Sequence, residues 1–118
     1  MPWSLSNDRP IYLQLVEQIQ RKILSGEYKT GERFPSVRDL AKESAVNPNT
    51  MQRALQELEQ SGLIVNNRTL GRTVTEDTAL ICQARRKLAI QRLEAFRREM
   101  TELGFTTEEL EDFMKEEN

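Results

Sequence analysis

The chain has 118 residues, of which 37% are hydrophobic and 31% charged, a composition that leaves room for one folded domain and an appendage and excludes a disordered chain. It contains no histidine and a single cysteine, Cys82, so it lacks the commonest general base and metal ligand and cannot form an internal disulfide. We therefore expect no enzymatic activity, no cofactor and no metal, and the net charge of −2 gives no general attraction to nucleic acid.

The charge is nevertheless unevenly distributed. Residues 1–75 carry 10 Lys or Arg against 8 Asp or Glu, a charge of +2, whereas residues 76–118 carry 7 against 11, a charge of −4. This distribution matters more than the total for a nucleic-acid partner. No apolar run approaches the ~18 residues of a membrane span, and the first ten residues do not resemble a secretory signal. We expect a cytoplasmic protein with no membrane partner.

The first predicted element is a helix from about Pro10 to Ser25. Proline suits a first helical turn, and Gly26 suits the position after the last one. Apolar residues at helical spacing make one face of it: Tyr12, Leu15, Val16, Ile19 and Ile23. A polar loop over 26–33 follows, and Phe34 then turns towards the core.

Two shorter helices come next. Ser36 and Asp39 resemble a capping box at the start of the first, whose Val37, Leu40 and Ala41 face inward. Asn47 caps the second, with Pro48 at its first position and Gly62 beyond its end. Because Met51, Leu55 and Leu58 repeat at helical spacing and must be buried, the outward side chains are those of Asn49, Gln52, Arg53 and Gln56.

After Leu63 the pattern changes from helix to strand. Ile64-Val65 and Thr73-Val74-Thr75 are β-prone runs on either side of a polar loop, Asn66 to Arg72. Three helices followed by a hairpin predict a mainly α fold with a small β-hairpin: a winged helix-turn-helix over 1–75. The hairpin must pack on the helical core, since an isolated one is marginally stable.

Residues 76–118 are predicted to form a helical tail. One helix ends at Gly104, and Thr106 with Glu109 forms a capping box for a short last helix. We interpret Cys82 as a small packing residue. The tail cannot bury its apolar stripe alone, so we expect it to mediate a homodimer, the alternative being packing against the helix over 10–25. The expected dimerisation residues are Ala89, Leu93, Phe96, Met100, Leu103, Leu110 and Phe113.

Two stretches resemble a known family. GEYKTGERFPSVRDLA and VNPNTMQRALQELEQSGLI are similar to the signature of the GntR family of bacterial winged-helix regulators, and the resemblance covers roughly residues 10–75. The short helical tail and the Asn-Pro-Asn-Thr start resemble the YtrA-type branch, which lacks large effector domains. One departure is Gln52, which stands where many members have arginine; glutamine pairs with an adenine edge instead of a guanine edge.

The resemblance implies that Arg38, on the helix that Ser36 caps, and the start of the helix after Asn47 contact double-stranded DNA. It also implies that the wing, which is the hairpin after Leu63, follows the DNA backbone or minor groove. Arg53 is suited to guanine or phosphate, and Lys42, Arg68 and Arg72 to phosphate. Capping alone also explains Asn47, and each basic residue is also consistent with an ordinary surface charge. The expected DNA-binding residues are Ser36, Arg38, Asn47, Asn49, Thr50, Gln52, Arg53, Arg68, Gly71 and Arg72.

These patterns lead to one functional hypothesis and one alternative. The hypothesis is a dimeric transcriptional regulator, a repressor of a pseudo-palindromic operator, and the YtrA-type resemblance suggests control of a transporter operon. The alternative is a winged-helix protein-interaction module that does not bind DNA; the amide-rich start of the helix after Asn47 argues against it. The sequence leaves open whether a small-molecule effector exists. Trp3, Tyr12 and Phe96 are candidate contacts for one, although apolar packing also explains them.

Overall fold

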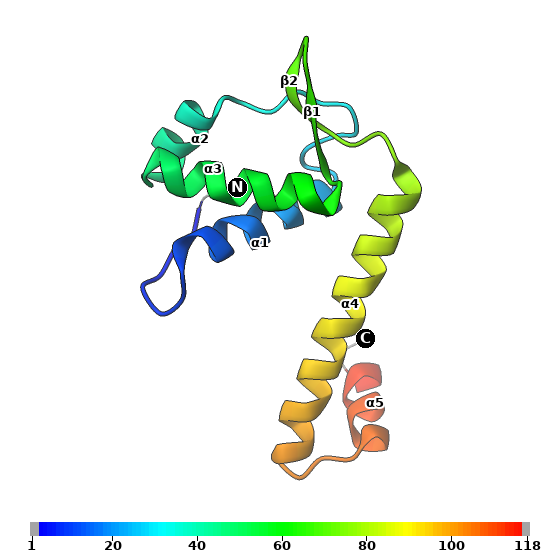
Figure 1. Cartoon of the computed structure of the whole chain (residues 1–118). Coiled ribbons are helices and arrows are strands. Elements are labelled where there is room, and N and C mark those ends of the chain that lie inside the picture. Colours follow the sequence, from blue (N-terminus) through cyan, green and yellow to red (C-terminus); the bar gives the residue numbers. More distant parts are fainter. Residues whose placement is uncertain (1–2, 117–118) are drawn as a thin grey trace. The chain divides into compact units, whose positions relative to one another are not determined.

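The computed structural model describes residues 3–116, which form five helices and one two-stranded sheet (Figure 1). The chain divides into two compact units, one up to Cys82 and one from Gln83 onward. The boundary between them falls inside the long helix over 78–102. The fold class expected from the sequence, mainly helical with a small hairpin, is confirmed.

The first helix, α1 (Ile11–Leu24), supplies one wall of the core. It is one residue shorter at each end than expected, because Pro10 has an extended conformation and serves as the N-cap. Leu15 and Ile19 are fully buried in the face that packs against α3. The polar Gln14 is buried as well, and its side-chain amide forms hydrogen bonds with the segment before α1. Its Nε2 donates to the carbonyl oxygens of Ser6 and Arg9 at 2.9 and 2.8 Å.

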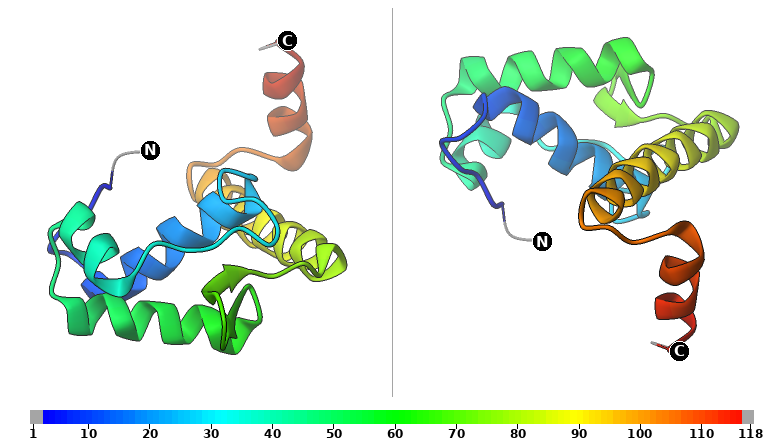
Figure 2. Two further views of the ribbon diagram at one scale, coloured as in Figure 1. Left: turned by 90° about the horizontal axis from the view of Figure 1, so that it is seen from above. Right: turned by 90° about the horizontal axis from the view of Figure 1, so that it is seen from below.

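The two helices of the helix-turn-helix are α2 (Val37–Ser44) and α3 (Pro48–Ser61). The backbone N–H of Asp39 donates to the Ser36 hydroxyl at 3.1 Å, which is one half of the expected capping box. Asn47 caps α3 as expected, accepting from the N–H of Asn49 at 2.8 Å. In both views of Figure 2, α3 lies across α1, with α2 beside the first turns of α3.

The core of this unit forms where these three helices meet the hairpin. Leu40, Met51, Leu55 and Leu58 are at most 1% exposed, and the predicted inward face of α3 is therefore confirmed. Phe34, the expected core residue of the loop, is 5% exposed and lies against Tyr28, with ring centroids 4.7 Å apart. The cluster buries the apolar faces that the sequence pattern indicated and gives α3 a rigid support.

The hairpin consists of β1 (Ile64–Asn67) and β2 (Gly71–Val74), paired antiparallel from Ile64↔Val74 to Asn67↔Gly71. The expected loop over 66–72 was too long, since both of its ends are strand. The reason is Asn67, whose side-chain oxygen accepts from the N–H groups of Thr69 and Leu70 at 2.8 and 3.1 Å and closes a tight turn. Gly71, with φ +78°, completes this turn in a conformation that favours glycine.

The tail contains α4 (Thr78–Glu102) and α5 (Thr107–Glu116). The capping box at the start of α5 is confirmed: Thr106 donates its N–H to Glu109 at 3.1 Å, and Glu109 donates its N–H to the Thr106 hydroxyl at 3.2 Å. The interpretation of Cys82 as a packing residue is wrong, because Cys82 is exposed in this single chain. The buried residue of that turn of α4 is its neighbour Ile81.

Candidate nucleic-acid interface

The outer face of α3 is polar along its first two turns. Asn49 and Arg53 are exposed there, while Thr50 and Gln52 are partly exposed at its two edges. The face is displayed because the opposite side of the same helix is anchored in the core by Met51 and its neighbours. Amide and guanidinium groups on a rigid helix are the side chains that hydrogen-bond to base edges in a major groove.

Arg53 is held in place by a residue of another helix. Its guanidinium carbon lies 3.6 Å from the centroid of the Tyr12 ring, so the cation stacks on the aromatic face. The stack covers one face of the planar group and leaves its N–H edge to solvent. Tyr12 comes from the first turn of α1, 41 positions earlier in the chain. The sequence placed it on the apolar face of α1 and among the candidate effector contacts, but it gave no sign of a contact with Arg53.

Ser36 and Asn47, two of the expected DNA-binding residues, are both occupied as helix caps. Each cap leaves further backbone N–H groups at the start of its helix, and such groups attract phosphate. Arg38, in the first turn of α2, and Lys42, in the last, are exposed. The start of α2 therefore combines backbone N–H groups with the nearby cationic side chain of Arg38.

A groove of about 290 Å³, here called the wing groove, separates the start of α2 from the hairpin. It brings together Ser36, Gly71 and Arg72, three expected site residues that lie up to 36 positions apart in the sequence. Two further polar residues line it that sequence reasoning missed, Arg33 and Asn66. Arg33 forms a bridge with Thr73 of β2, so the loop before α2 is attached to the wing. No sequence signal indicated this pairing.

Arg72 does not lie in this groove as a free cation. Its guanidinium forms an ion pair with Glu59 of α3, and the side chains of Arg72 and Glu59 are only 18% and 26% exposed. The expectation that Arg72 contacts phosphate overlooked this partner. The pair joins the hairpin to α3, whereas Arg68, in the turn between the strands, is exposed.

The apolar residues expected to mediate dimerisation are mostly exposed in the single chain. Leu93 is 47% exposed, Phe96 43%, Leu103 68% and Phe113 43%, and Ala89 is also exposed. Met100 is partly buried.

Leu110 departs from the expectation. It is only 7% exposed within the second unit, because α5 turns it inward, and it therefore stabilises the tail itself instead of a dimer. In the same unit, the rings of Phe105 and Phe113 meet edge to face, with their centroids 5.3 Å apart.

Within residues 3–116 no group of His, Cys, Asp and Glu side chains has an arrangement able to hold a metal ion. Over the same residues, no helix combines the length and apolar character needed to span a bilayer.

Comparison with known proteins supports this description. Residues 11–74 match the family model of bacterial regulatory proteins, gntR family. The HTH-type transcriptional regulator YhcF of Bacillus subtilis is 37% identical over 109 residues, covering 92% of this chain and 90% of that protein. The HTH-type transcriptional repressor YtrA of the same organism is 32% identical over 108 residues, covering 91% and 83%. A GntR family transcriptional regulator from Listeria monocytogenes superimposes with a TM-score of 0.89 at 38% identity, covering 95% of this chain and 98% of that one.

Proposed function

The chain belongs to the gntR family of bacterial regulatory proteins and is a DNA-binding transcriptional regulator with a winged helix-turn-helix. From this premise we propose that it is a dimeric repressor that occupies a pseudo-palindromic operator in the cytoplasm. In this proposal residues 1–75 bind DNA and residues 76–118 dimerise.

The observation that supports operator recognition is the outer face of α3. Asn49, Gln52 and Arg53 present amide and guanidinium groups from a helix fixed in the core. Amides are suited to adenine edges and a guanidinium to guanine, so this face reads sequence, while Arg38 and the wing groove follow the phosphate backbone. The assignment of these residues is part of the proposal.

The exposed stripe of the tail supports dimerisation. Leu93, Phe96 and Leu103 leave a large apolar area in water on one helix, and an area of this kind on a small protein marks an interaction site. A two-fold dimer would present two α3 helices to half-sites one helical turn of DNA apart, about 34–36 Å.

Repression and its target are supported by likeness alone. The relative YtrA of Bacillus subtilis is named a transcriptional repressor. We extend that mode of action to this chain, with a transporter operon as the regulated unit, because its short helical tail resembles the YtrA-type branch.

The proposal is tested by footprinting the purified chain on the DNA upstream of its own gene, with light scattering on the same preparation. We expect two protected half-sites related by a dyad, binding that weakens steeply with salt, and a dimer at micromolar concentration. Light scattering that shows a monomer at this concentration would contradict the proposed dimer. No salt-dependent binding, either to that fragment or to a pool of random duplex DNA, would favour the protein-interaction module.

A further inference from the structure

The tail is divided by charge along its length. Residues 83–93, here called the basic half, carry four Lys or Arg and no Asp or Glu, a charge of +4. Residues 94–116, here called the acidic half, carry three Lys or Arg against eight Asp or Glu, a charge of −5. The basic half lies in the middle of α4, and the acidic half contains the end of α4 and all of α5.

Three of the four charged side chains of the basic half border the exposed apolar stripe. Arg85 and Arg86 precede Ala89 by four and three positions, and Arg92 follows it by three. Residues three and four apart are neighbours on a helix surface, so these three arginines surround Ala89 on the face that carries Leu93. All three are exposed.

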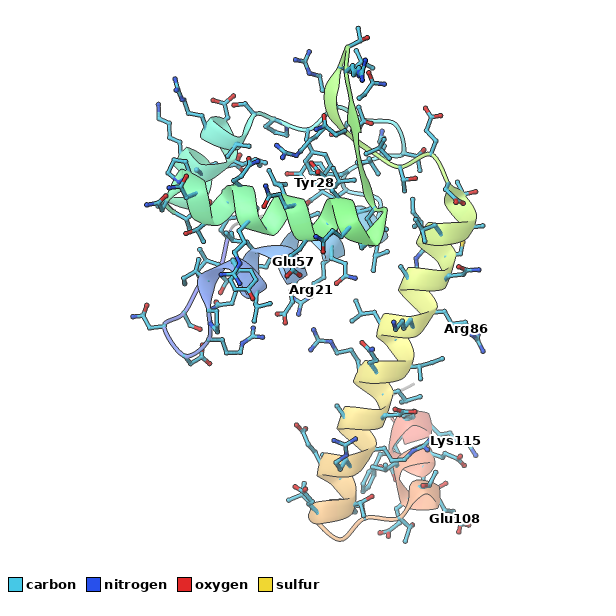
Figure 3. The ribbon with its side chains drawn as sticks, in the orientation of Figure 1. Arg21, Tyr28, Glu57, Arg86, Glu108 and Lys115 are labelled. Atoms are coloured by element: carbon cyan, nitrogen blue, oxygen red, sulfur yellow. The ribbon has the colours of Figure 1, made fainter. Side chains whose placement is uncertain are left out.

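The two halves do not neutralise each other inside one chain. The ion pairs formed among residues 3–116, Arg9–Glu17 and Arg72–Glu59, both lie in the first unit, and none joins two residues of 83–116. Glu109 is engaged by the cap of α5, but Glu111, Asp112 and Glu116 are exposed on that helix. In Figure 3, Arg86 projects from the first part of α4, and Glu108 and Lys115 project from α5.

This pattern restricts how a second copy can cover the stripe. Parallel tails would place +4 beside +4 and −5 beside −5, with every arginine around Ala89 facing its own counterpart. Antiparallel tails place each basic half beside the acidic half of the partner. Charges at the rim of an interface contribute little affinity one by one, but they select orientation by penalising juxtaposed like charges.

We infer that the tail is a self-complementary docking surface for a second copy of this chain: the helices pair antiparallel, and the basic half of each lies against the acidic half of the other. This inference rests on the proposed homodimer and adds its orientation. The two halves then contact each other twice, once on each side of the two-fold axis.

The inference is tested by exchanging charges between two full-length variants. The first, Arg85→Glu/Arg86→Glu/Arg92→Glu, makes the basic half acidic; the second, Glu111→Lys/Asp112→Lys/Glu116→Lys, makes α5 basic and spares the cap. We expect each variant alone to dimerise at least about tenfold more weakly than the wild type. An equimolar mixture is expected to restore a heterodimer of wild-type affinity at low salt, measured by native mass spectrometry and sedimentation equilibrium.

A control variant reverses charge on the far side of α4. Lys87→Glu/Arg98→Glu lies on the helix face opposite Ala89 and Leu93 and is expected to dimerise like the wild type. Unweakened dimers of both charge-exchanged variants, no heterodimer in the mixture, or an equal loss in this control would each overturn the inference. A monomeric wild type would instead overturn the proposed dimer.

Oxidative cross-linking of Cys82 measures orientation independently of the charges. If antiparallel α4 helices cross near Leu93, the two Cys82 residues stand roughly 33 Å apart at ~1.5 Å per residue, whereas parallel helices place them side by side. We expect no disulfide-linked dimer from the wild type and a linked dimer from Leu103→Cys, through Cys82 and the partner's new thiol. Efficient linkage of the wild type, or no linkage of Leu103→Cys, would overturn the antiparallel arrangement.

Discussion

At the scale of single residues, the structure connects Arg53 to Tyr12. The sequence predicted that Arg53 faces outward, which it does, but the position of its guanidinium depends on an aromatic ring of another helix at 3.6 Å. A long side chain loses rotamer freedom when it binds, and a stack that already restricts it lowers that cost. Tyr12 therefore restricts the Arg53 side chain before the proposed DNA contact at its N–H edge is made.

We predict that Arg53→Ala costs about 1–3 kcal/mol of binding free energy on the footprinted operator and less on random DNA. Tyr12→Leu is expected to cost part of that amount. It is expected to cost nothing further in the Arg53→Ala background, because both changes remove the same stack of Arg53 on Tyr12. Tyr12→Phe keeps the ring and serves as the matched control. Fluorescence anisotropy with the wild type and these four variants on both DNAs measures these values. Additive losses of binding free energy from Tyr12→Leu and Arg53→Ala would show that the two residues act independently.

At the scale of elements, the turn between α2 and α3 carries strain. Ala45, the C-cap of α2, has φ 58° and ψ 43°, and it is the one non-glycine residue with positive φ among residues 3–116. The left-handed conformation costs an L-residue roughly 1–2 kcal/mol, which glycine avoids while losing more chain entropy on folding. The turn sets the direction of α3, so its geometry is retained despite this cost.

We therefore predict that Ala45→Gly raises the free energy of unfolding by about 0.5–1 kcal/mol, the relief of strain outweighing the added entropy of the unfolded chain. Urea unfolding followed by circular dichroism measures it. Ala54→Gly, at a buried position inside α3, is the matched control and is expected to destabilise. A loss of stability in Ala45→Gly would show that the turn is not strained.

The wing is the element whose stability depends most on its neighbours. Two strands alone are marginal in water. Here β2 is attached on both sides: Arg72 pairs with Glu59 of α3, and Thr73 forms a bridge with Arg33 of the preceding loop. These two contacts join the wing to α3 and to the loop that lines the wing groove.

At the scale of the whole molecule, two winged helices that each bind DNA weakly can bind it tightly only if a dimer links them. The first 75 residues carry a charge of only +2, so one winged helix alone is expected to bind DNA weakly. Linking two of them converts the second binding event into an intramolecular one and raises affinity by roughly 10²–10⁴. In the proposed dimer, the tail is therefore expected to matter as much for operator occupancy as α3.

We predict that Leu93→Glu/Phe96→Glu yields a folded monomer whose affinity for the full operator falls by roughly 10²–10⁴, while its affinity for an isolated half-site stays close to that of the wild type. Both side chains are nearly half exposed in the single chain, so their replacement leaves its core intact. Light scattering and half-site titrations check the two parts. Unchanged affinity on the full operator would show that dimerisation does not contribute to binding.

The elements and their caps were predictable because they depend on residues close together in the chain. Ser36, Asn47 and Thr106 each act on a backbone N–H two or three positions away, and the apolar spacing of α3 determines which of its faces is buried. The helices, the hairpin and the outward face of α3 could therefore be derived from the amino-acid order alone.

The contacts that shape the candidate site join segments far apart in the chain. Tyr12 meets Arg53, Glu59 meets Arg72, and the loop before α2 lines a groove with the wing. Leu110 was assigned to an interface for the same reason, since its apolar character was visible but the inward turn of α5 was not. Local sequence thus determined which side chains are available for recognition, and tertiary packing decided which of them are held by a partner, because only packing brings distant segments within contact distance.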